Sequence, residues 1–326
     1  MKGNRVIGTG AGYPDRIMTN EDLAKIVDTT DEWIFSRTGI KERRIAEDHE
    51  STSDFAATAS LQACEMAGVD PEEIDLIILA TLSPDMLLPS TACIVQGKIG
   101  AKNAACFDLE AACTGFVYGL ACANGMMPEA GIKHALVIGA ETLSRVIDWS
   151  DRNTCVIFAD GAGAALVRHE GGDRGIMSTY LRADGSAPPP WLMVSPGVAY
   201  RGPFSEGSGT DFAIRMEGKE VFKFGVKALP DAVIGAAERA GVAIEDLDMV
   251  IPHQANIRII DAGAKALGVD RDKFFVNLDK FGNTSAGTIP LAMDQANREG
   301  RLKEGDLLAL SGFGAGLTWG GCIIRW

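Results

Sequence analysis

Cys113 has the residue type and the position of a nucleophile. An apolar, strand-like run over residues 104–109 ends before it, and a helical run of small residues over 114–127 begins after it. A thiol in the first turn of a helix lies at the positive end of the helix dipole, which favours the thiolate by about 0.3–1 kcal/mol, or ~2 kcal/mol when partly buried. We therefore expect its pKa to be lowered by roughly half a unit to 1.5 units. The following helix is apolar on all sides and should be buried.

Two polar residues in the second half of the chain are candidates to act with this thiol. His253 follows a strand-like run over residues 249–251, and Pro252 ends that run. Asn283 lies in a loop of small residues that opens a helix. Taken singly, each also has a structural interpretation, as a satisfied interior histidine or a turn-forming asparagine. Local context alone leaves both interpretations open.

The remaining cysteines are expected to pack in the core, because unpaired cysteine is among the most buried residue types. They are Cys64, Cys93, Cys106, Cys122, Cys155 and Cys322. No Cys-x-x-Cys pair occurs, so neither a zinc site nor a dithiol redox site is indicated. The odd, scattered count favours a reducing compartment.

Composition limits the class of protein. The chain has 326 residues, of which 46% are hydrophobic, and its net charge is −13. This length suits two domain-sized units or one large core. We expect no signal peptide and no membrane span, because no apolar run approaches ~20 residues, and we therefore predict a cytoplasmic protein. The negative charge argues against binding to nucleic acid.

The two halves of the chain repeat one pattern. A shift of 173 residues places the segment 67–78 over 240–251, with Ala-Gly-Val identical at the start of both. Amphipathic helices precede the two segments, at 53–66 and 218–239, and buried strands follow at 135–139 and 307–310. We infer a duplicated α/β fold with halves at 1–170 and 171–326.

A glycine-rich run over residues 8–12 suggests a different function, dinucleotide binding. That fingerprint requires a third glycine, at position 13, that opens a helix. Tyr13-Pro14-Asp15 follows here instead, which is a turn. The oxidoreductase interpretation is therefore disfavoured.

Several longer motifs accompany the three candidate residues. They are 29–40 (TTDEWIFSRTGI), 111–116 (AACTGF), 160–164 (DGAGA), 252–256 (PHQAN), 282–287 (GNTSAG) and 312–320 (GFGAGLTWG). Together they resemble the β-ketoacyl-acyl carrier protein synthase III family of the thiolase-like superfamily, and the resemblance covers the chain from end to end. It implies an α/β fold, namely a duplicated thiolase-like five-layer αβαβα sandwich.

The resemblance also implies a reaction. Cys113 would take a short acyl group from acyl-CoA and release CoA. Malonyl-acyl carrier protein would then lose CO₂, with His253 and Asn283 donating hydrogen bonds to the enolate oxygen. The carbanion would attack the acylated thiol, whose oxyanion would lie between the backbone N–H groups of Cys113 and Ala315. The CoA thioesters are substrates, and no cofactor or metal is expected.

Further residues follow from the same resemblance. Those expected to bind CoA are Thr29, Trp33, Arg37, Arg152, Gly218 and Asn256. Those expected to dock acyl carrier protein are Gln254, Ala255, Asn256, Ile257, Arg258, Lys223 and Lys265, with Lys219 and Lys227 nearby. The primer pocket is expected at Leu143, Phe158, Phe313 and, from the partner subunit's loop in a homodimer, Leu88.

Three alternatives remain at this point. The same scaffold serves condensing enzymes of secondary metabolism and acyltransferases related to ketosynthase III. A catalytically inactive homologue is disfavoured because Cys113, His253 and Asn283 are all present. The choice of primer, from acetyl to branched or longer acyl groups, is open.

Overall fold

Two β-sheets organise the chain. The structure, a computed structural model, describes residues 3–172, 174–186, 191–195 and 213–326. The first sheet has the order β1-β7-β6-β4-β5 and the second the order β11-β12-β13-β8. Their strands are β1 (Asn4–Gly12), β4 (Leu76–Ala80), β5 (Ala105–Leu109), β6 (His134–Thr142), β7 (Asp160–His169), β8 (Gly175–Ala183), β11 (Met249–Pro252), β12 (Leu307–Gly314) and β13 (Thr318–Arg325).

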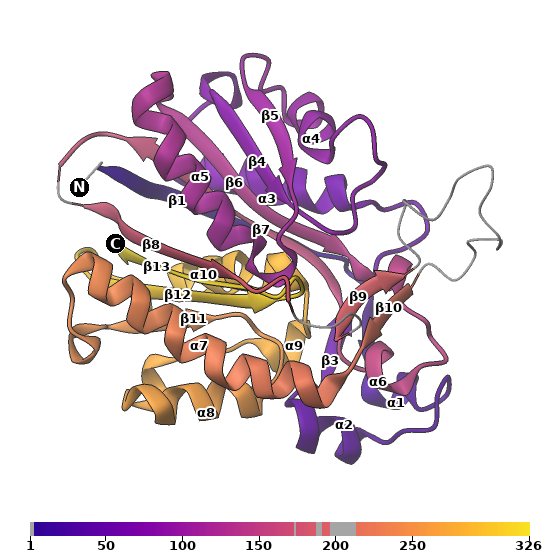
Figure 1. Ribbon diagram of the computed structural model, residues 1–326. Helices are drawn as coiled ribbons and strands as arrows, with labels where there is room; N and C mark the ends of the chain where they lie inside the picture. Colours follow the sequence, from indigo (N-terminus) through magenta and orange to yellow (C-terminus); the bar gives the residue numbers. More distant parts are fainter. Residues whose placement is uncertain (1–2, 173, 187–190, 196–212) are drawn as a thin grey trace.

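Helices cover both faces of both sheets, which gives five layers (Figure 1). The outer helices of the first sheet are α3 (Thr52–Ala67) and α4 (Thr91–Ile99), and those of the second are α7 (Gly218–Ala240) and α8 (Ile257–Leu267). Between the sheets lie α5 (Gly115–Ala130) and α10 (Thr288–Arg298). Their side chains share one apolar core, in which Phe116 and Leu120 of α5 join Ile289 and Met293 of α10. The expected αβαβα sandwich is confirmed.

The internal repeat is visible in the topology. In the first half, α3 leads through the 3-10 helix η1 (Pro71–Glu73) to β4, and in the second half α7 leads through η5 (Ile244–Asp246) to β11. β4 pairs in parallel with β6, and β11 pairs in parallel with β12. β6 then pairs antiparallel with β7, and β12 with β13. The chain passes from one half to the other between the end of β7 and the start of β8.

The glycines near the start of the chain have a packing role. Residues 8–12 lie inside β1, where a Cβ atom at Gly8, Gly10 or Gly12 would come within 2.1 Å of a backbone oxygen of α3. These glycines let α3 lie directly on the strand. The dinucleotide-binding interpretation is therefore wrong, because no phosphate can approach this buried backbone.

A smaller group of elements lies beside one end of the sandwich (Figure 1). It shares a separate apolar cluster that includes Leu23, Ile34, Phe158 and Ile214. Its elements are β2 (Ile17–Thr19), α1 (Asn20–Leu23), α2 (Asp31–Thr38), β3 (Glu42–Arg44), η3 (Leu143–Val146), α6 (Arg152–Cys155), β9 (Leu192–Ser195), β10 (Ala213–Met216) and α9 (Leu278–Phe281). Three further 3-10 helices are η2 (Ala112–Thr114), η6 (Arg271–Lys273) and η7 (Ser285–Gly287).

The cysteines differ in burial, although all seven are unpaired. Cys64, Cys155 and Cys322 are buried as expected, and Cys106 and Cys122 are half-buried. Cys93 was expected in the core but is exposed, because it lies on the outer side of α4. Within the described residues, no helix has the length and apolar character needed to cross a bilayer.

Candidate active site

Cys113 lies at the start of the buried central helix. It is the middle residue of η2, which leads directly into α5. Ala112, just before it, has φ of 46°, a conformation that non-glycine residues rarely adopt and that clusters at functional sites. The turn after β12 approaches closely, because a Cβ at Gly314 would be 2.8 Å from the Cys113 backbone nitrogen. Thr318 fixes that turn by donating to the carbonyl oxygens of Ala315 and Ala111, at 3.0 and 3.2 Å.

The charge state of this thiol differs from the sequence prediction. The helix start is present, but Cys113 is only 4% exposed. Burial raises the pKa of the thiol to about 12, and the nearby carboxylates of Glu141 and Glu110 act in the same direction. The expected lowering is wrong because the cost of burying a thiolate exceeds the ~0.3–2 kcal/mol that a helix dipole supplies. The resting site therefore holds a neutral thiol.

His253 enters the same site from the end of β11. Its backbone N–H donates to the Ser311 carbonyl at 2.7 Å, which ties it to the neighbouring strand. Burial lowers the pKa of the imidazole to about 3, so the ring is neutral at physiological pH. The Phe313 ring packs edge-on against it, with the ring centroids 5.1 Å apart.

The His253 ring contacts Thr288. Nδ1 lies 2.7 Å from the Thr288 hydroxyl. That hydroxyl also lies 3.0 Å from the Ser285 carbonyl, which accepts from the Thr288 backbone N–H as well. When the hydroxyl donates to Nδ1, the ring proton is on Nε2, and His253 presents a hydrogen-bond donor to the site.

Asn283 is held rigidly by its backbone and its own side-chain oxygen. Its N–H donates to the Ile157 carbonyl at 3.0 Å, and its carbonyl accepts from Ala159 at 2.9 Å. Its Oδ1 accepts from the Ser285 backbone N–H at 2.8 Å. The side-chain amide therefore has its Nδ2 group left to donate. Asn283 is only 4% exposed, so this donor is screened from bulk water.

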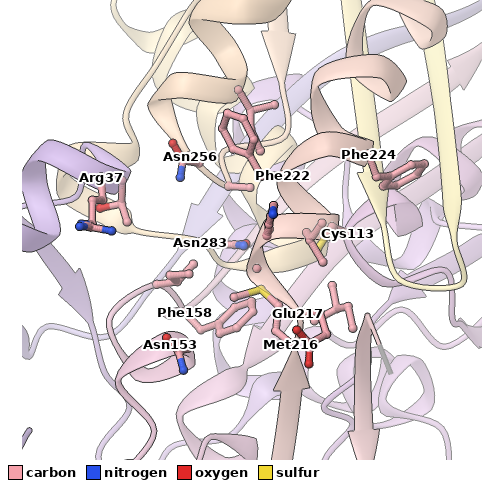
Figure 2. A pocket seen from close by; sticks show the side chains of 18 of the residues that line it. Arg37, Cys113, Asn153, Phe158, Met216, Glu217, Phe222, Phe224, Asn256 and Asn283 are labelled. Carbon is pink, nitrogen blue, oxygen red and sulfur yellow. The ribbon is translucent and has the colours of Figure 1, made fainter. Parts of the chain in front are cut away.

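One cleft brings the three residues together. Its volume is about 670 Å³, and Cys113, His253 and Asn283 all line it. Figure 2 shows Cys113, Asn283 and Phe158 around one hollow, with Arg37 and Asn256 on another side of it. Neither His253 nor Asn283 alone indicated a function. Their position with Cys113 around one cleft supports the interpretation that the three residues act together.

The predicted CoA residues lie along the same cleft, with one exception. Trp33, Arg37, Arg152, Gly218 and Asn256 line it, whereas Thr29 does not. Two guanidinium groups lie over the Trp33 ring, at 4.6 Å for Arg37 and 4.9 Å for Arg152. Arg152 also donates to the Asp28 carbonyl at 3.0 Å. An adenine ring that stacks between Trp33 and Arg152 would have to displace the Arg152 guanidinium from this position.

A second, apolar cavity of about 280 Å³ begins at Cys113. Of the predicted primer residues, only Phe158 lines it: Phe313 lines the cleft instead, Leu143 is buried in a neighbouring cluster, and Leu88 is 85% exposed. The sequence analysis missed most of its apolar lining, which is Leu82, Leu192, Met193, Val194 and Ile214. Ala315, the expected second oxyanion donor, also lines this cavity.

Of the predicted docking residues, Ala255, Asn256 and Arg258 line the cleft, as does the nearby Lys219. Arg258 is exposed and lies over the Phe222 ring at 5.3 Å, which joins the starts of α7 and α8. Lys219, Lys223, Lys227 and Lys265 are exposed on the same two helices. Gln254 was expected on this surface, but it is only 1% exposed and its amide donates to the carbonyls of Pro252 and Phe275. It is therefore part of the interior.

A duplicated sandwich with a cysteine at the central helix and a histidine and an asparagine from the second half defines a condensing enzyme of the thiolase-like class. Comparison with known proteins narrows the class. Residues 107–185 match the model for 3-oxoacyl-[acyl-carrier-protein] synthase III, and residues 237–326 match the model for its C-terminal part. The chain belongs to the 3-oxoacyl-acyl carrier protein synthase III family.

Individual relatives span the whole chain. The chain is 53% identical to beta-ketoacyl-[acyl-carrier-protein] synthase III of Clostridium acetobutylicum, over 100% of this chain and 99% of the relative. It is 45% identical to the crystal structure of 3-oxoacyl-[acyl-carrier-protein] synthase III from Aquifex aeolicus, with a TM-score of 0.92 over 99% and 100% of the two chains. The priming β-ketosynthase of the R1128 polyketide pathway is 36% identical, with a TM-score of 0.92 over 99% and 97%.

Proposed function

We propose that this protein catalyses the initiating condensation of fatty-acid synthesis, in which an acyl group from acyl-CoA is joined to malonyl-acyl carrier protein. The observation that carries the proposal is the meeting of one thiol and two neutral hydrogen-bond donors in a single cleft. The products are 3-oxoacyl-acyl carrier protein, CoA and CO₂. The 53% identity to the clostridial synthase, against 36% to the polyketide enzyme, favours fatty-acid synthesis over secondary metabolism.

In the first step, Cys113 attacks the thioester carbonyl of a short acyl-CoA. The bond to Sγ forms, the C–S bond to CoA breaks, and the thiol proton ends on the departing CoA sulfur. The acyl chain enters the apolar cavity that begins at the thiol. Backbone N–H groups of Cys113 and of the turn at Ala315 are suited to bind the oxyanion, because Gly314 brings that turn against Cys113.

In the second step, malonyl-acyl carrier protein binds in the emptied cleft and loses CO₂. Breaking the C–C bond leaves its electron pair as an enolate, so no base is needed to remove a proton. Nε2–H of His253 and Nδ2–H of Asn283 stabilise the enolate oxygen, which carries charge only after the bond begins to break. The carbanion then attacks the acyl group on Cys113 and displaces Sγ as a thiolate, which takes up a proton from solvent to restore the thiol.

The partners follow from the cleft. Trp33, Arg37 and Arg152 suit the nucleotide end of CoA, because a cationic and aromatic mouth binds phosphate and adenine. The cations of α7 and α8 suit an acidic carrier protein. We also place the protein in the cytoplasm, which agrees with seven unpaired cysteines. Fractionation of cells that make the protein tests this location, and recovery outside the cytoplasm contradicts it.

We propose that the enzyme is a homodimer. Met86, Leu87 and Leu88 form an apolar loop tip that is 49%, 75% and 85% exposed, and β5 is the last strand at its edge of the first sheet. Exposed apolar tips and unpaired sheet edges are typical of subunit interfaces. Light scattering in solution tests this proposal. A mass of 34.5 kDa, that of one chain, would contradict it.

Separating the two half-reactions tests the proposed roles. His253→Ala and Asn283→Ala should still form the acyl-enzyme from acetyl-CoA. Each should release CO₂ from malonyl-acyl carrier protein about 10²–10³-fold more slowly, the usual cost of losing one such donor. If His253→Ala also fails to acylate Cys113, the histidine is a base for the thiol and the division of roles is wrong.

A further inference from the structure

A buried carboxylate lies behind the nucleophile and has no part in the reaction described above. Glu141, near the end of β6, is fully buried. Its Oε2 accepts hydrogen bonds from the Thr81 hydroxyl at 3.0 Å, from the Leu82 and Ser83 backbone N–H groups at 3.1 Å, and from the Ser83 hydroxyl at 2.5 Å. Its Oε1 has only a longer contact with Leu82 N, at 3.3 Å. One oxygen is therefore held firmly and the other is nearly free.

Ser285 lies on a short helix that packs against the elements carrying this carboxylate and the thiol. The short helix η7 packs against both β6 and η2, and a Cβ at Gly139 would meet the backbone of Ala286 at 2.1 Å. Ser285 is 1% exposed, and its hydroxyl has no hydrogen bond of ordinary geometry among the described residues. Ser285 and Cys113 line the same cavity, and the Ser285 hydroxyl is near enough to the Cys113 thiol and the Glu141 carboxylate to lower the pKa of each.

The backbone of Ser285 points to a specific requirement at this position. Its φ is 49°, and among the described non-glycine residues only Ser285 and Ala112 have positive φ. Both flank the thiol, one in sequence and one in space. Such a conformation costs on the order of 1–3 kcal/mol and persists only where the surroundings enforce it. At Ser285, this backbone conformation occurs at a residue whose hydroxyl is near the Cys113 sulfur.

The acylation step needs an acceptor for the thiol proton. Burial raises the pKa of the Cys113 thiol to about 12, so spontaneous ionisation near neutral pH is rare. Burial lowers the pKa of His253 to about 3, which makes its ring a weak base. Burial raises the pKa of Glu141 to about 7, against the opposing effect of its hydrogen bonds. Among these groups, Glu141 is the one matched to neutral pH as a proton acceptor.

We propose that Ser285 and Glu141 form a proton relay for Cys113, with Glu141 as a positioning residue that acts through the serine hydroxyl. As Sγ attacks the acyl-CoA, its proton passes to Ser285 Oγ, and the serine proton passes to Glu141 Oε1. The carboxylate becomes a carboxylic acid, the acyl-thioester forms on Cys113, and CoA leaves as a thiolate. The proton then returns from Glu141 to the departing CoA thiolate, which restores the Glu141 carboxylate and gives free CoA. The inference rests on the proposed acyl transfer to Cys113.

Other ionisable groups among the described residues also lie near Ser285 and Glu141. Glu110 lies near Cys113, His253 lines the cleft beside the thiol, and Asp160 lies on β7, which pairs with β6. The Asp160 carboxylate accepts from the Ala46 N–H at 2.7 Å and from Ser144, and so faces away from Ser285. β4 and α5, which also pack against β6, face the shared core with apolar side chains.

The test is the pH dependence of single-turnover acylation by acetyl-CoA. In the wild type the rate should rise with pH through about 7, because only the carboxylate form of Glu141 can accept a proton. Glu141→Gln retains an oxygen for the donors at Oε2 but cannot accept the proton, and Ser285→Ala removes the relay and leaves the carboxylate in place. Both should be slower by about 10²-fold at pH 7 and should lose the rise near pH 7. The double variant should be no slower than either single variant.

Two controls complete the experiment. Asp160→Asn neutralises a similarly buried carboxylate without a contact to Ser285, so it should keep the wild-type pH dependence. Alkylation of Cys113 by iodoacetamide, which needs no acyl-CoA, should show the same losses as acylation. A wild type that forms no acyl-enzyme would contradict the proposed function. Formation of acyl-enzyme with an unchanged pH profile in Glu141→Gln and Ser285→Ala, or faster alkylation in either, would overturn the relay alone.

Discussion

The side chains proposed to carry the chemistry are hidden from bulk water, and this burial sets their charge. Cys113, His253 and Asn283 are 4%, 2% and 4% exposed. The low-dielectric surroundings disfavour a thiolate and an imidazolium alike, so both titratable groups rest in their neutral forms. A neutral histidine and an amide suit an enolate intermediate, because they stabilise charge as it develops without binding the uncharged thioester strongly.

The charge state of His253 leads to a prediction about pH. The pKa of its ring is lowered from 6.5 to about 3, so the ring is neutral at every pH above about 3. The rate of malonyl-acyl carrier protein decarboxylation should therefore show no step near pH 6.5. Single-turnover CO₂ release between pH 5 and pH 8 measures it (a range in which an unperturbed histidine titrates). A loss of rate centred on pH 6.5 would mean that the ring is solvated and titrates normally.

Thr288 provides a second test at the residue scale. Its hydroxyl lies 2.7 Å from His253 Nδ1, and the proposed donor role of Nε2 requires the hydroxyl to donate to that nitrogen. Thr288→Val removes that contact with little change of shape, whereas Thr288→Ser keeps it. The valine variant should decarboxylate malonyl-acyl carrier protein about 10-fold or more slowly, by the magnitude of one lost donor, while acylation is retained. Nitrogen NMR of the ring should show protonated Nε2 in the wild type and the serine variant. Protonated Nδ1 in the wild type would refute the assignment.

At the scale of elements, the site is assembled from the segments that follow two strands and one short helix. β5 leads to η2 and Cys113, β11 leads to His253, and the loop after α9 carries Asn283. These junctions were predictable because the apolar run of a strand and the small residues of a helix differ locally. The inner cavity was not predictable, since Leu192 and Ile214 come from short strands whose apolar residues could equally belong to a core.

The walls of the inner cavity lead to a prediction about primer size. Ile214 on β10 is 2% exposed and lines the cavity of about 280 Å³. Ile214→Phe fills part of that space, so it should lower kcat/KM for isobutyryl-CoA relative to acetyl-CoA. One methylene-sized group in a hydrophobic pocket changes the discrimination between two substrates by about 10–200-fold. We expect the ratio of kcat/KM for isobutyryl-CoA to that for acetyl-CoA to change by an amount at the lower end of that range. Rates with a panel of acyl-CoA primers measure it, with acetyl-CoA as the internal control. An unchanged ratio would place the acyl chain elsewhere.

The helices around the cleft lead to a prediction about docking. Arg258 on α8 packs over Phe222 of α7 at the mouth of the cleft. Arg258→Glu should slow the step with malonyl-acyl carrier protein, make it less sensitive to added salt, and leave acetyl-CoA transfer near normal. Lys133→Glu, which changes the net charge equally at an exposed residue just before β6, is the matched control. Equal losses with both substrates would assign Arg258 to the CoA site or to folding.

At the scale of the molecule, the duplicated sandwich places the proposed nucleophile, Cys113, in one half and the proposed enolate donors, His253 and Asn283, in the other. The central helices α5 and α10 pack in one core, so the two halves fold as a unit around the site. The repeat at a shift of 173 residues was visible in the sequence because both copies keep the same helix–turn–strand order. The close packing of α3 on Gly8, Gly10 and Gly12 was not visible in the sequence, because a glycine inside a strand cannot be distinguished there from a glycine that binds phosphate.

Net charge also acts at this scale. A chain of net charge −13 that meets an acidic partner must rely on local cations. Lys219 and Arg258 line the cleft, and the exposed side chains of Lys223, Lys227 and Lys265 lie further along α7 and α8. Burial of Gln254 narrows the docking surface that the resemblance implied. The burial of Gln254 results from tertiary packing, and it could not be predicted from the sequence because glutamine is a polar residue that is usually exposed.

The central claim is that Cys113 carries the acyl group, and it can be tested by mass spectrometry. After treatment with acetyl-CoA, the intact protein should gain the mass of one acetyl group, and digestion should place that group on the peptide with Cys113. Cys113→Ala should abolish the gain. Cys93→Ala, which removes the most accessible thiol, should leave it unchanged. Acetylation of Cys93, Cys106 or Cys122 in the wild type, or a persistent gain in Cys113→Ala, would contradict the account.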